Sequence, residues 1–226
     1  VNLNNKMSLS IIAKFDYNYS MKSLPNIIPI FPLSGVIYFP KTNLPLNIFE
    51  ERYLDLVNDS FRNDKLMGMV QSKKENSLVY KVGCLGKISD YQETSDGRVL
   101  INLTGITRFE IKKEISNKKK YREFEVDYGK FYKDLMIPEK IDIAYDKFSF
   151  IDKVKNFFEK NGLMINWKEF EKLDETQKVN TLSMIAPISN EEKQKLLETV
   201  SLNEKTKTLL NIIEFYSYEN SFDKET

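Results

Sequence analysis

The chain has 226 residues, with 34 basic and 33 acidic side chains and a formal net charge of +1. This balance gives no reason to expect a polyanionic partner. Histidine is absent and Cys84 is the only cysteine, so a histidine base, an intrachain disulfide and a cysteine-rich zinc site are excluded. A single cysteine fits a reducing, cytoplasmic compartment. No apolar run approaches the roughly 18 residues that span a bilayer, so no membrane partner is expected.

Glycine and proline positions divide the chain. Seven of the eight glycines lie at or before Gly129, and five of the seven prolines lie at or before Pro45. Turn-rich sequence is typical of β structure, whereas its absence favours helices. We therefore predict an α+β fold with a β-rich domain over residues 25–135 and a helical domain over residues 136–226. Residues 1–24 lack the basic and apolar segments of a signal peptide, and we expect them to form a loose leader.

The β-rich domain is predicted to contain short, mostly antiparallel strands. Four prolines within residues 28–45 exclude a long helix there, because each removes a backbone donor. A first helix is predicted after residue 49, with an apolar stripe that includes Tyr53, Val57 and Phe61. Strands are predicted at residues 36–39, 44–48, 66–70, 84–93, 98–103, 106–115 and 121–131, with a hairpin turn at 94–97. Such short strands suggest a barrel or a sandwich.

Apolar periodicity changes in the second half of the chain. Spacing near 3.6 residues predicts helices at 143–158, 167–173, 179–186 and 203–218. A further helix is predicted to begin after Ser189, because Ser189 and Glu192 have the spacing of a capping box. We expect these helices to pack as a bundle.

Several motifs of the β-rich domain resemble those of one family. Pro45-Leu46-x-Ile48-Phe49-Glu50-x-Arg52-Tyr53 is similar to the signature of the Lon N-terminal substrate-binding domain family. Later stretches resemble further motifs of that family in the same order: Val82–Ile88, Asp96-Gly97-Arg98 and Gly105-x-x-Arg108-Phe109. Two positions depart from the family pattern, namely Lys41 in place of glycine and Lys120 in place of proline. The resemblance covers roughly residues 25–132 and, more faintly, the helices that follow.

This resemblance implies a PUA-like β-pseudobarrel followed by a C-terminal α-helical bundle. It also implies a non-catalytic module of bacterial protein quality control that binds unfolded or degron-bearing polypeptides. The sequence contains no phosphate-binding Gly-x-x-x-x-Gly-Lys-[Ser/Thr] loop, so neither an ATPase nor a cofactor is predicted. The sequence does not identify the substrate-binding residues, the bound polypeptide, a partner protease or the oligomeric state.

We favour a structural role for the motif residues. Phe49, Tyr53 and Phe109 are expected in the core. Glu50 is expected to form an ion pair with Arg52 or Arg108 and so tie the first helix to the barrel, although either arginine could instead bind an anionic ligand. The remaining motif positions are expected to fix turns and strand geometry: Pro45, Asp96, Gly97, Arg98 and Gly105.

Catalytic roles for these and other residues are less well supported than structural ones. The carboxylate pairs Glu50–Glu51 and Glu191–Glu192 could act as acid and base, but both lie at predicted helix starts, where they suit the helix dipole. Cys84 could be a nucleophile, but no histidine can activate it, and a buried cysteine in a strand is the simpler interpretation. We therefore predict no catalytic and no metal-binding residue.

One basic segment supports an alternative function. It contains Lys112, Lys113, Lys118, Lys119, Lys120 and Arg122, and PUA-like barrels occur in RNA-binding proteins. The alternative is thus an RNA-binding or ribosome-associated module that uses this hairpin. Four glutamates lie in the same window, so its excess is only two positive charges. We favour a solvated hairpin tip, where lysines also discourage pairing between sheets.

Overall fold

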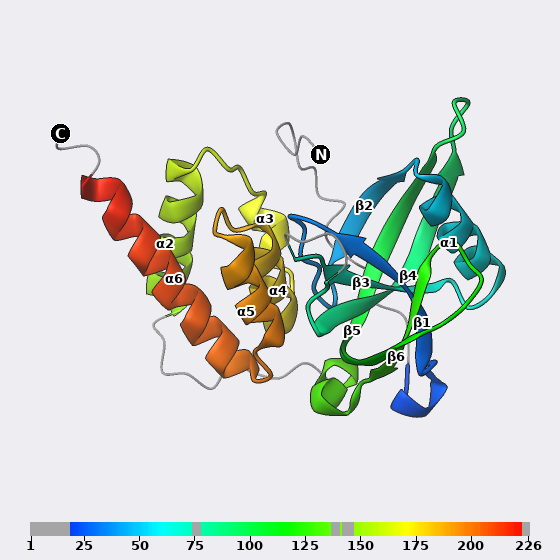
Figure 1. The fold of residues 1–226 in the computed structure, drawn as a ribbon. Helices are drawn as coiled ribbons and strands as arrows, with labels where there is room; N and C mark the ends of the chain where they lie inside the picture. The colour runs from blue at the N-terminus through cyan, green and yellow to red at the C-terminus, as the bar shows by residue number, and fades with distance from the viewer. Residues whose placement is uncertain (1–18, 74–77, 137–140, 142–146, 223–226) are drawn as a thin grey trace. The chain divides into compact units, whose positions relative to one another are not determined.

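The structure, a computed structural model, describes residues 19–73, 78–136, 141 and 147–222. The described residues form two compact units, one ending at Met136 and the other beginning at Ile141 (Figure 1). Of the expected leader, residues 1–18 lie outside the described part. A short 3-10 helix, η1 (Met21–Ser23), follows, and Leu24 is buried in the barrel core. The packed structure therefore begins before residue 25.

Six strands of the first unit form one sheet in the order β2-β5-β4-β3-β1-β6. Because β6 also pairs with β5, five strands close into a barrel, and β2 extends one half of β5 (Figure 1). Only β1 and β3 are parallel. The elements are β1 (Ile27–Leu33), β2 (Asn43–Ile48), α1 (Glu51–Arg62), β3 (Leu66–Gln71), β4 (Val82–Glu93), β5 (Val99–Ile115), β6 (Arg122–Asp127) and the 3-10 helix η2 (Gly129–Leu135). The predicted barrel and the α+β class are confirmed.

Two predicted strand segments are wrong. Residues 36–39 form no strand among the described residues, although Tyr38 and Phe39 are fully buried. Their apolar character thus reflects burial in an irregular segment rather than strand pairing. The last strand ends at Asp127 rather than at Phe131, and Phe131 lies buried in η2.

Phe109 is fully buried in the barrel interior. This interior is formed by apolar side chains that alternate along the strands, among them Ile28, Ile30, Leu85, Ile106, Phe124 and Val126. The tip of the Phe109 ring lies against two glycines. A Cβ atom at Gly83 would be 2.6 Å from Phe109 Cζ, and one at Gly68 would be 3.0 Å away. The two glycines therefore make the space that this large ring fills.

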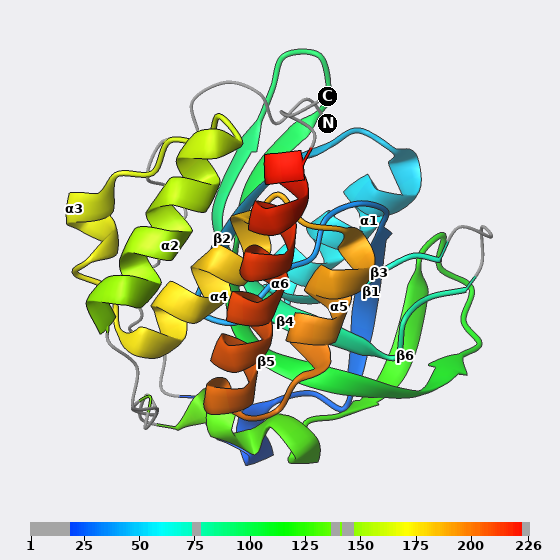
Figure 2. The same cartoon turned by 90° about the vertical axis from the view of Figure 1, so that its left-hand side faces the viewer.

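The second unit is helical. Its helices are α2 (Lys147–Lys160), α3 (Trp167–Phe170), α4 (Glu175–Ile185), α5 (Asn190–Glu198) and α6 (Leu202–Phe222). Helix α6 packs against α2, α4 and α5 (Figure 2). The predicted capping box is confirmed, because the Glu192 N–H donates to Ser189 Oγ and the Ser189 N–H donates to Glu192 Oε2. The predicted start of α2 at residue 143 lies outside the described part.

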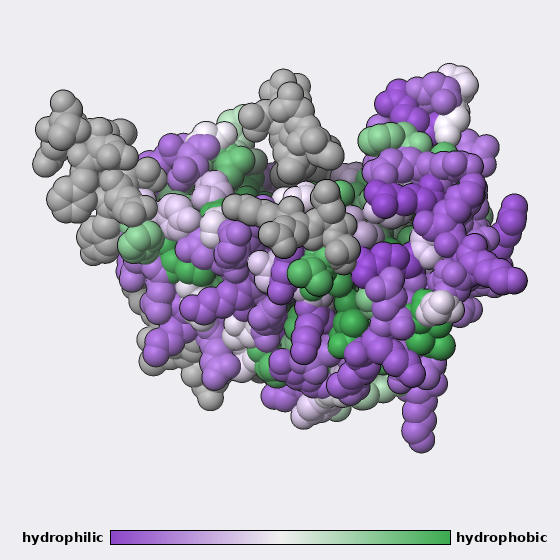
Figure 3. Space-filling model, viewed as in Figure 1, coloured by the Kyte–Doolittle hydropathy of each residue, from purple (hydrophilic) through white to green (hydrophobic). Residues whose placement is uncertain are grey.

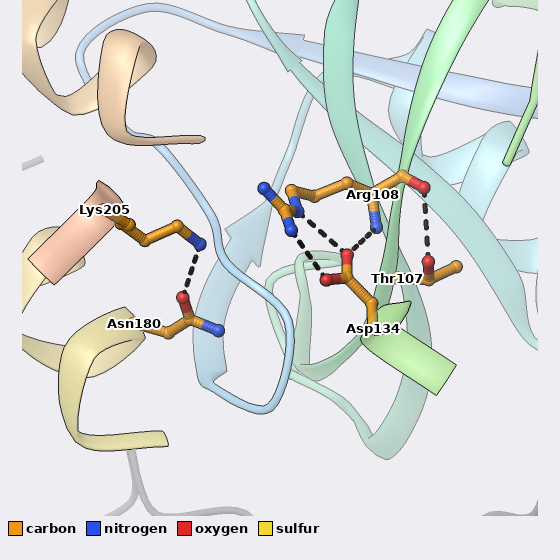
Figure 4. Close-up of polar contacts among 5 residues, drawn as sticks. All are labelled: Thr107, Arg108, Asp134, Asn180 and Lys205. Carbon is orange, nitrogen blue, oxygen red and sulfur yellow. Dashed lines mark hydrogen bonds and ion pairs between the residues drawn. The ribbon is translucent and has the colours of Figure 1, made fainter. Parts of the chain in front are cut away.

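The helical core contains a buried cation. Lys205 Nζ of α6 donates to Asn180 Oδ1 of α4 across 2.9 Å (Figure 4). Both side chains are almost fully buried, so this hydrogen bond ties the two helices together inside the unit. Among the described helices, none is long and apolar enough to cross a membrane.

Candidate functional site

The motif residues around the start of α1 divide between core and surface. Tyr53 is buried, and its ring contacts Phe31 at a centroid distance of 4.3 Å. The expectation that Phe49 lies in the core is wrong, because 66% of its surface is exposed. Glu50 accepts from Arg52 at 2.8 Å within the same exposed turn. This local pair does not tie α1 to the barrel, as we had expected Glu50 to do.

Arg108 has a different partner. Its guanidinium donates to both carboxylate oxygens of Asp134 in η2, at 2.9 and 2.7 Å, and its backbone N–H donates to the same carboxylate (Figure 4). The guanidinium carbon also lies 4.3 Å from the centroid of the Phe131 ring. Both members of the pair are buried, with side chains 4% and 9% exposed. Arg108 thus docks η2 against β5, and these contacts occupy the face with which it could have bound an anion.

The Asp-Gly-Arg motif forms the turn between β4 and β5. The Arg98 Nε–H donates to Asp96 at 2.7 Å, and the Thr94 hydroxyl donates to the same carboxylate. These bonds, led by the one from Arg98, hold the pKa of the Asp96 carboxyl well below its usual range. Gly97 adopts a φ of +81°, which favours glycine in such a turn. The Asp-Gly-Arg motif therefore serves to form the turn of the β4–β5 hairpin.

The basic hairpin between β5 and β6 is largely neutralised. Five of its six cations lie within ion-pair distance of carboxylates: Lys112 with Asp127, Lys113 with Glu125, Lys119 with Glu123, Lys120 with Glu51 and Asp55, and Arg122 with Glu114. The sixth is Lys118, which is exposed at the tip. The hydrogen bond to Glu123 raises the pKa of Lys119 to about 12. This hairpin presents paired rather than unbalanced positive charge.

The residues considered as catalytic alternatives have structural roles or are buried. Glu51 pairs with Lys120, whose hydrogen bond lowers the pKa of the Glu51 carboxyl. Glu192 belongs to the capping box of α5. Cys84 is fully buried in β4. Within the described ranges, no group of three histidine, cysteine or acidic side chains could hold a metal ion.

A three-stranded extension of the barrel carries the remaining motif residues. It consists of β2, residues 99–104 of β5 and residues 90–93 of β4 (Figure 1). Its strands are in register, so that Leu100 lies between Asn47 and Gln92, and Asn102 lies between Pro45 and Asp90. Since successive residues of a strand point to opposite faces, these six side chains share one face. The other face carries the buried side chains of Ile48, Val99 and Ile101.

Three apolar side chains lie exposed on the first of these faces. Leu100 is 39% exposed, and it is the diagonal cross-strand neighbour of both Pro45 and Phe49 at about 7–8 Å. Phe49 follows Ile48 directly, so alternation places it on the same face as Pro45. We call Pro45, Phe49 and Leu100, with the surrounding amides of Asn47, Gln92 and Asn102, the extension patch. Figure 3 shows apolar surface just below the tip of the β4–β5 hairpin.

The extension patch continues the sheet face that lines the barrel. Farther along β5, Ile106 on that face enters the barrel core. A hydrogen-bonded cluster separates the two regions: the Thr104 hydroxyl donates to Asn43 Oδ1 at 2.8 Å and lies 2.9 Å from the Ser89 hydroxyl. Thr104 and Asn43 are buried. The sheet face is thus buried inside the barrel but exposed to solvent at the patch.

The side chains of the extension patch are apolar or uncharged, and the exposed carboxylate of Asp90 borders them on the same face. The motif ion pairs beside it, Glu50–Arg52 and Asp96–Arg98, are each internally neutral. Asn102 Oδ1 is buried and accepts no hydrogen bond within the described part of the chain. A buried acceptor without a donor costs about 1–3 kcal/mol. This buried oxygen offers no acceptor to a ligand, so the patch presents exposed apolar side chains beside the exposed amides of Asn47 and Gln92.

The sequence contains one signal for this patch. The alternation over residues 98–103 correctly places Leu100 on the face opposite Val99 and Ile101, beside polar Asn102. A leucine on the polar face of an amphipathic strand indicates an apolar surface position. The contribution of Phe49 and Pro45 could not be read in the same way, because it depends on the pairing of β2 with β5.

Comparison with known proteins gives the family to which the chain belongs. Residues 27–214 match the ATP-dependent protease La (LON) substrate-binding domain. The chain therefore belongs to this family, as its motifs suggested.

Individual Lon proteases are similar to most of this chain. A Lon protease of Syntrophus aciditrophicus is 24% identical over 202 residues, which are 84% of this chain, and one of Malacoplasma penetrans is 27% identical over 194 residues, which are 78%. The chain spans about a quarter of the length of these curated relatives. The matched part is the substrate-binding domain rather than the protease domain.

Solved structures share the fold. The Lon N-terminal domain protein from Xanthomonas campestris has a TM-score of 0.60 and 21% identity, covering 82% of this chain and 97% of that one. The N-terminal domain of the Mycobacterium avium complex Lon protease has a TM-score of 0.58 and 17% identity, covering 83% and 98%.

Proposed function

We propose that this protein is a non-catalytic module that binds unfolded or degron-bearing polypeptides, and that the extension patch makes the contact. We assign this role to the barrel domain, residues 25–135, and place it in cytoplasmic protein quality control. The observation that carries the proposal is the exposed pair Phe49 and Leu100 on one face of the extension. Large apolar side chains gathered at a surface mark sites of interaction.

The chemistry of the patch favours an extended apolar segment. Phe49, Leu100 and Pro45 offer apolar contacts, while the amides around them can bond to the backbone of a bound chain. The exposed parts of Phe49 and Leu100 would each contribute about 1 kcal/mol or more when covered. A few such contacts give modest affinity with little dependence on exact sequence, which suits a protein that must accept many unfolded partners.

The experiment is a titration of a labelled, permanently unfolded polypeptide with this protein, followed by fluorescence anisotropy. We expect saturable binding that RNA does not compete away. The variant carrying Phe49→Ser and Leu100→Thr should bind about tenfold more weakly or worse, since 1.4 kcal/mol corresponds to a factor of ten. Both side chains are exposed, and threonine keeps the strand preference of position 100, so the fold should be unaffected.

A matched control is Leu78→Ser, which removes a side chain of the same unit that is 57% exposed but belongs to no strand of the extension. It should bind like the wild type. Equal binding by the patch variant and the wild type would move the site elsewhere. No binding to the polypeptide, together with salt-sensitive binding to RNA, would reject the proposal in favour of the basic hairpin.

A further inference from the structure

Asp90 lies at the border of the extension patch. It is on β4, directly opposite Asn102 and diagonal to Leu100, on the same face of the sheet. Its side chain is exposed. Phe49, Leu100 and Asp90 therefore form a diagonal line across the three strands of the extension. Each diagonal step is about 7–8 Å, so the line is about 15 Å long and equals about four or five residues of extended chain.

Among the described residues, Asp90 has no ion-pair partner. Its carboxylate accepts the backbone N–H of Tyr91 at 2.9 Å. Within the described part of the chain, no lysine or arginine lies within ion-pair distance of it. The other charged motif residues beside the patch differ in this respect, because Arg98 neutralises Asp96 and Arg52 neutralises Glu50. The apolar patch is therefore bordered by one exposed negative charge.

We propose that Asp90 determines the specificity of this surface, so that it prefers apolar segments that carry a lysine or arginine about four or five residues from their main apolar side chain. This inference rests on the proposed function of the extension patch. A segment lying along the diagonal would place its apolar side chain against Phe49 and Leu100 and its cation beside Asp90. A segment with a carboxylate at the same position would be repelled.

The expected preference is modest. An exposed ion pair contributes about 0.2–1 kcal/mol, which corresponds to a factor of about 1.5 to 5 in affinity. The preference should fall as salt rises from low to physiological concentration, because salt screens exposed charges. The apolar contribution of the patch should remain.

The test uses three labelled unstructured peptides that are identical except for one position, four residues after a central phenylalanine. That position carries lysine, glutamine or glutamate. Anisotropy titrations at low salt compare the full wild-type chain with Asp90→Asn and Asp90→Lys. We expect the wild type to bind the lysine peptide about threefold more tightly than the glutamate peptide. Asp90→Asn should remove this preference, and Asp90→Lys should reverse it.

Asp64→Asn is the matched control, because it removes one exposed carboxylate from the turn between α1 and β3. It should keep the wild-type preference. A preference that survives Asp90→Asn, or a wild type that binds all three peptides equally, would overturn the role of Asp90 while leaving the proposed function intact. If the glutamine peptide did not bind at all, both the proposed function and this inference would be rejected.

Discussion

The Arg108 guanidinium and the Asp134 carboxylate meet at two points inside the first unit, and the same carboxylate also accepts the Arg108 backbone N–H. Twenty-six residues separate the two partners. One pair thereby joins strand β5 to η2, the last described element of the barrel unit. A buried pair of this kind is costly to break, because the remaining charge stays desolvated.

We therefore expect Asp134→Ala to destabilise the barrel unit by about 3–5 kcal/mol. Urea unfolding followed by circular dichroism would measure this loss. Glu125→Ala is a suitable control, because it breaks the exposed pair with Lys113 and should cost less than about 1 kcal/mol. Equal losses in the two variants would show that the Arg108–Asp134 pair contributes no more than a surface pair.

Gly105 supports a close approach of two chain segments. A Cβ atom at this position would overlap the backbone oxygen of Phe39 and lie 3.0 Å from Pro40 Cα. Because these are backbone atoms, they cannot move aside as a flexible side chain would. Gly105→Ala should therefore destabilise the unit by about 1–3 kcal/mol, the usual cost of overpacking.

Gly129→Ala provides the comparison for Gly105. A Cβ atom there would meet only the end of the exposed Asp127 side chain, at 3.1 Å, which can give by a few tenths of an ångström while it keeps its bond from the Gly129 N–H. Thermal unfolding should show a clear loss for Gly105→Ala and little change for Gly129→Ala. A native-like melting temperature for Gly105→Ala would mean that the segment around Phe39 can shift freely.

Tyr121 makes the stability of the barrel unit depend on pH in the alkaline range. Burial, followed by the hydrogen bond from its hydroxyl to Asp59, raises the pKa of Tyr121 to about 12. The folded state thus favours the neutral phenol over the phenolate. This contribution is complete below pH 10, the ordinary pKa of tyrosine, and is lost as the pH rises from 10 through 12.

Tyr121→Phe should therefore be less stable than the wild type at pH 9, with a smaller difference at pH 12. Chemical unfolding of both proteins at the two pH values gives the comparison. Other buried tyrosines affect both proteins alike, so the difference between them isolates Tyr121. A stability difference that does not change with pH would argue against a shifted pKa.

The fold could largely be predicted from sequence because its signals are local. Turn residues, alternation over residues 98–103 and the capping box at Ser189 each depend on a few neighbouring residues. The prediction failed at residues 36–39, where a run of apolar residues has the composition of a strand but no strand partner among the described residues. Lys41 is a related case: it adopts a φ of +59°, the left-handed conformation that favours glycine.

The candidate site was harder to predict because its geometry depends on distant pairings. Phe49 was assigned to the core on the basis of its residue type, whereas the end of β2 leaves it at the surface. The partner of Arg108 lies in η2 (Gly129–Leu135), a helix that was not predicted and whose start falls within the strand predicted over residues 121–131. Leu100 and Phe49 come together only because β2 pairs with β5 in one particular register.

The hydrogen-bonded cluster of Thr104, Asn43 and Ser89 has a consequence for the proposed binding of polypeptides. It ends the open part of the sheet face, so a segment held at the extension patch cannot slide onward between the strands of the barrel. Under the proposed function, capture and release would then need no opening of the barrel. The lifetime of such a complex would depend on how much apolar surface the bound segment covers at the patch.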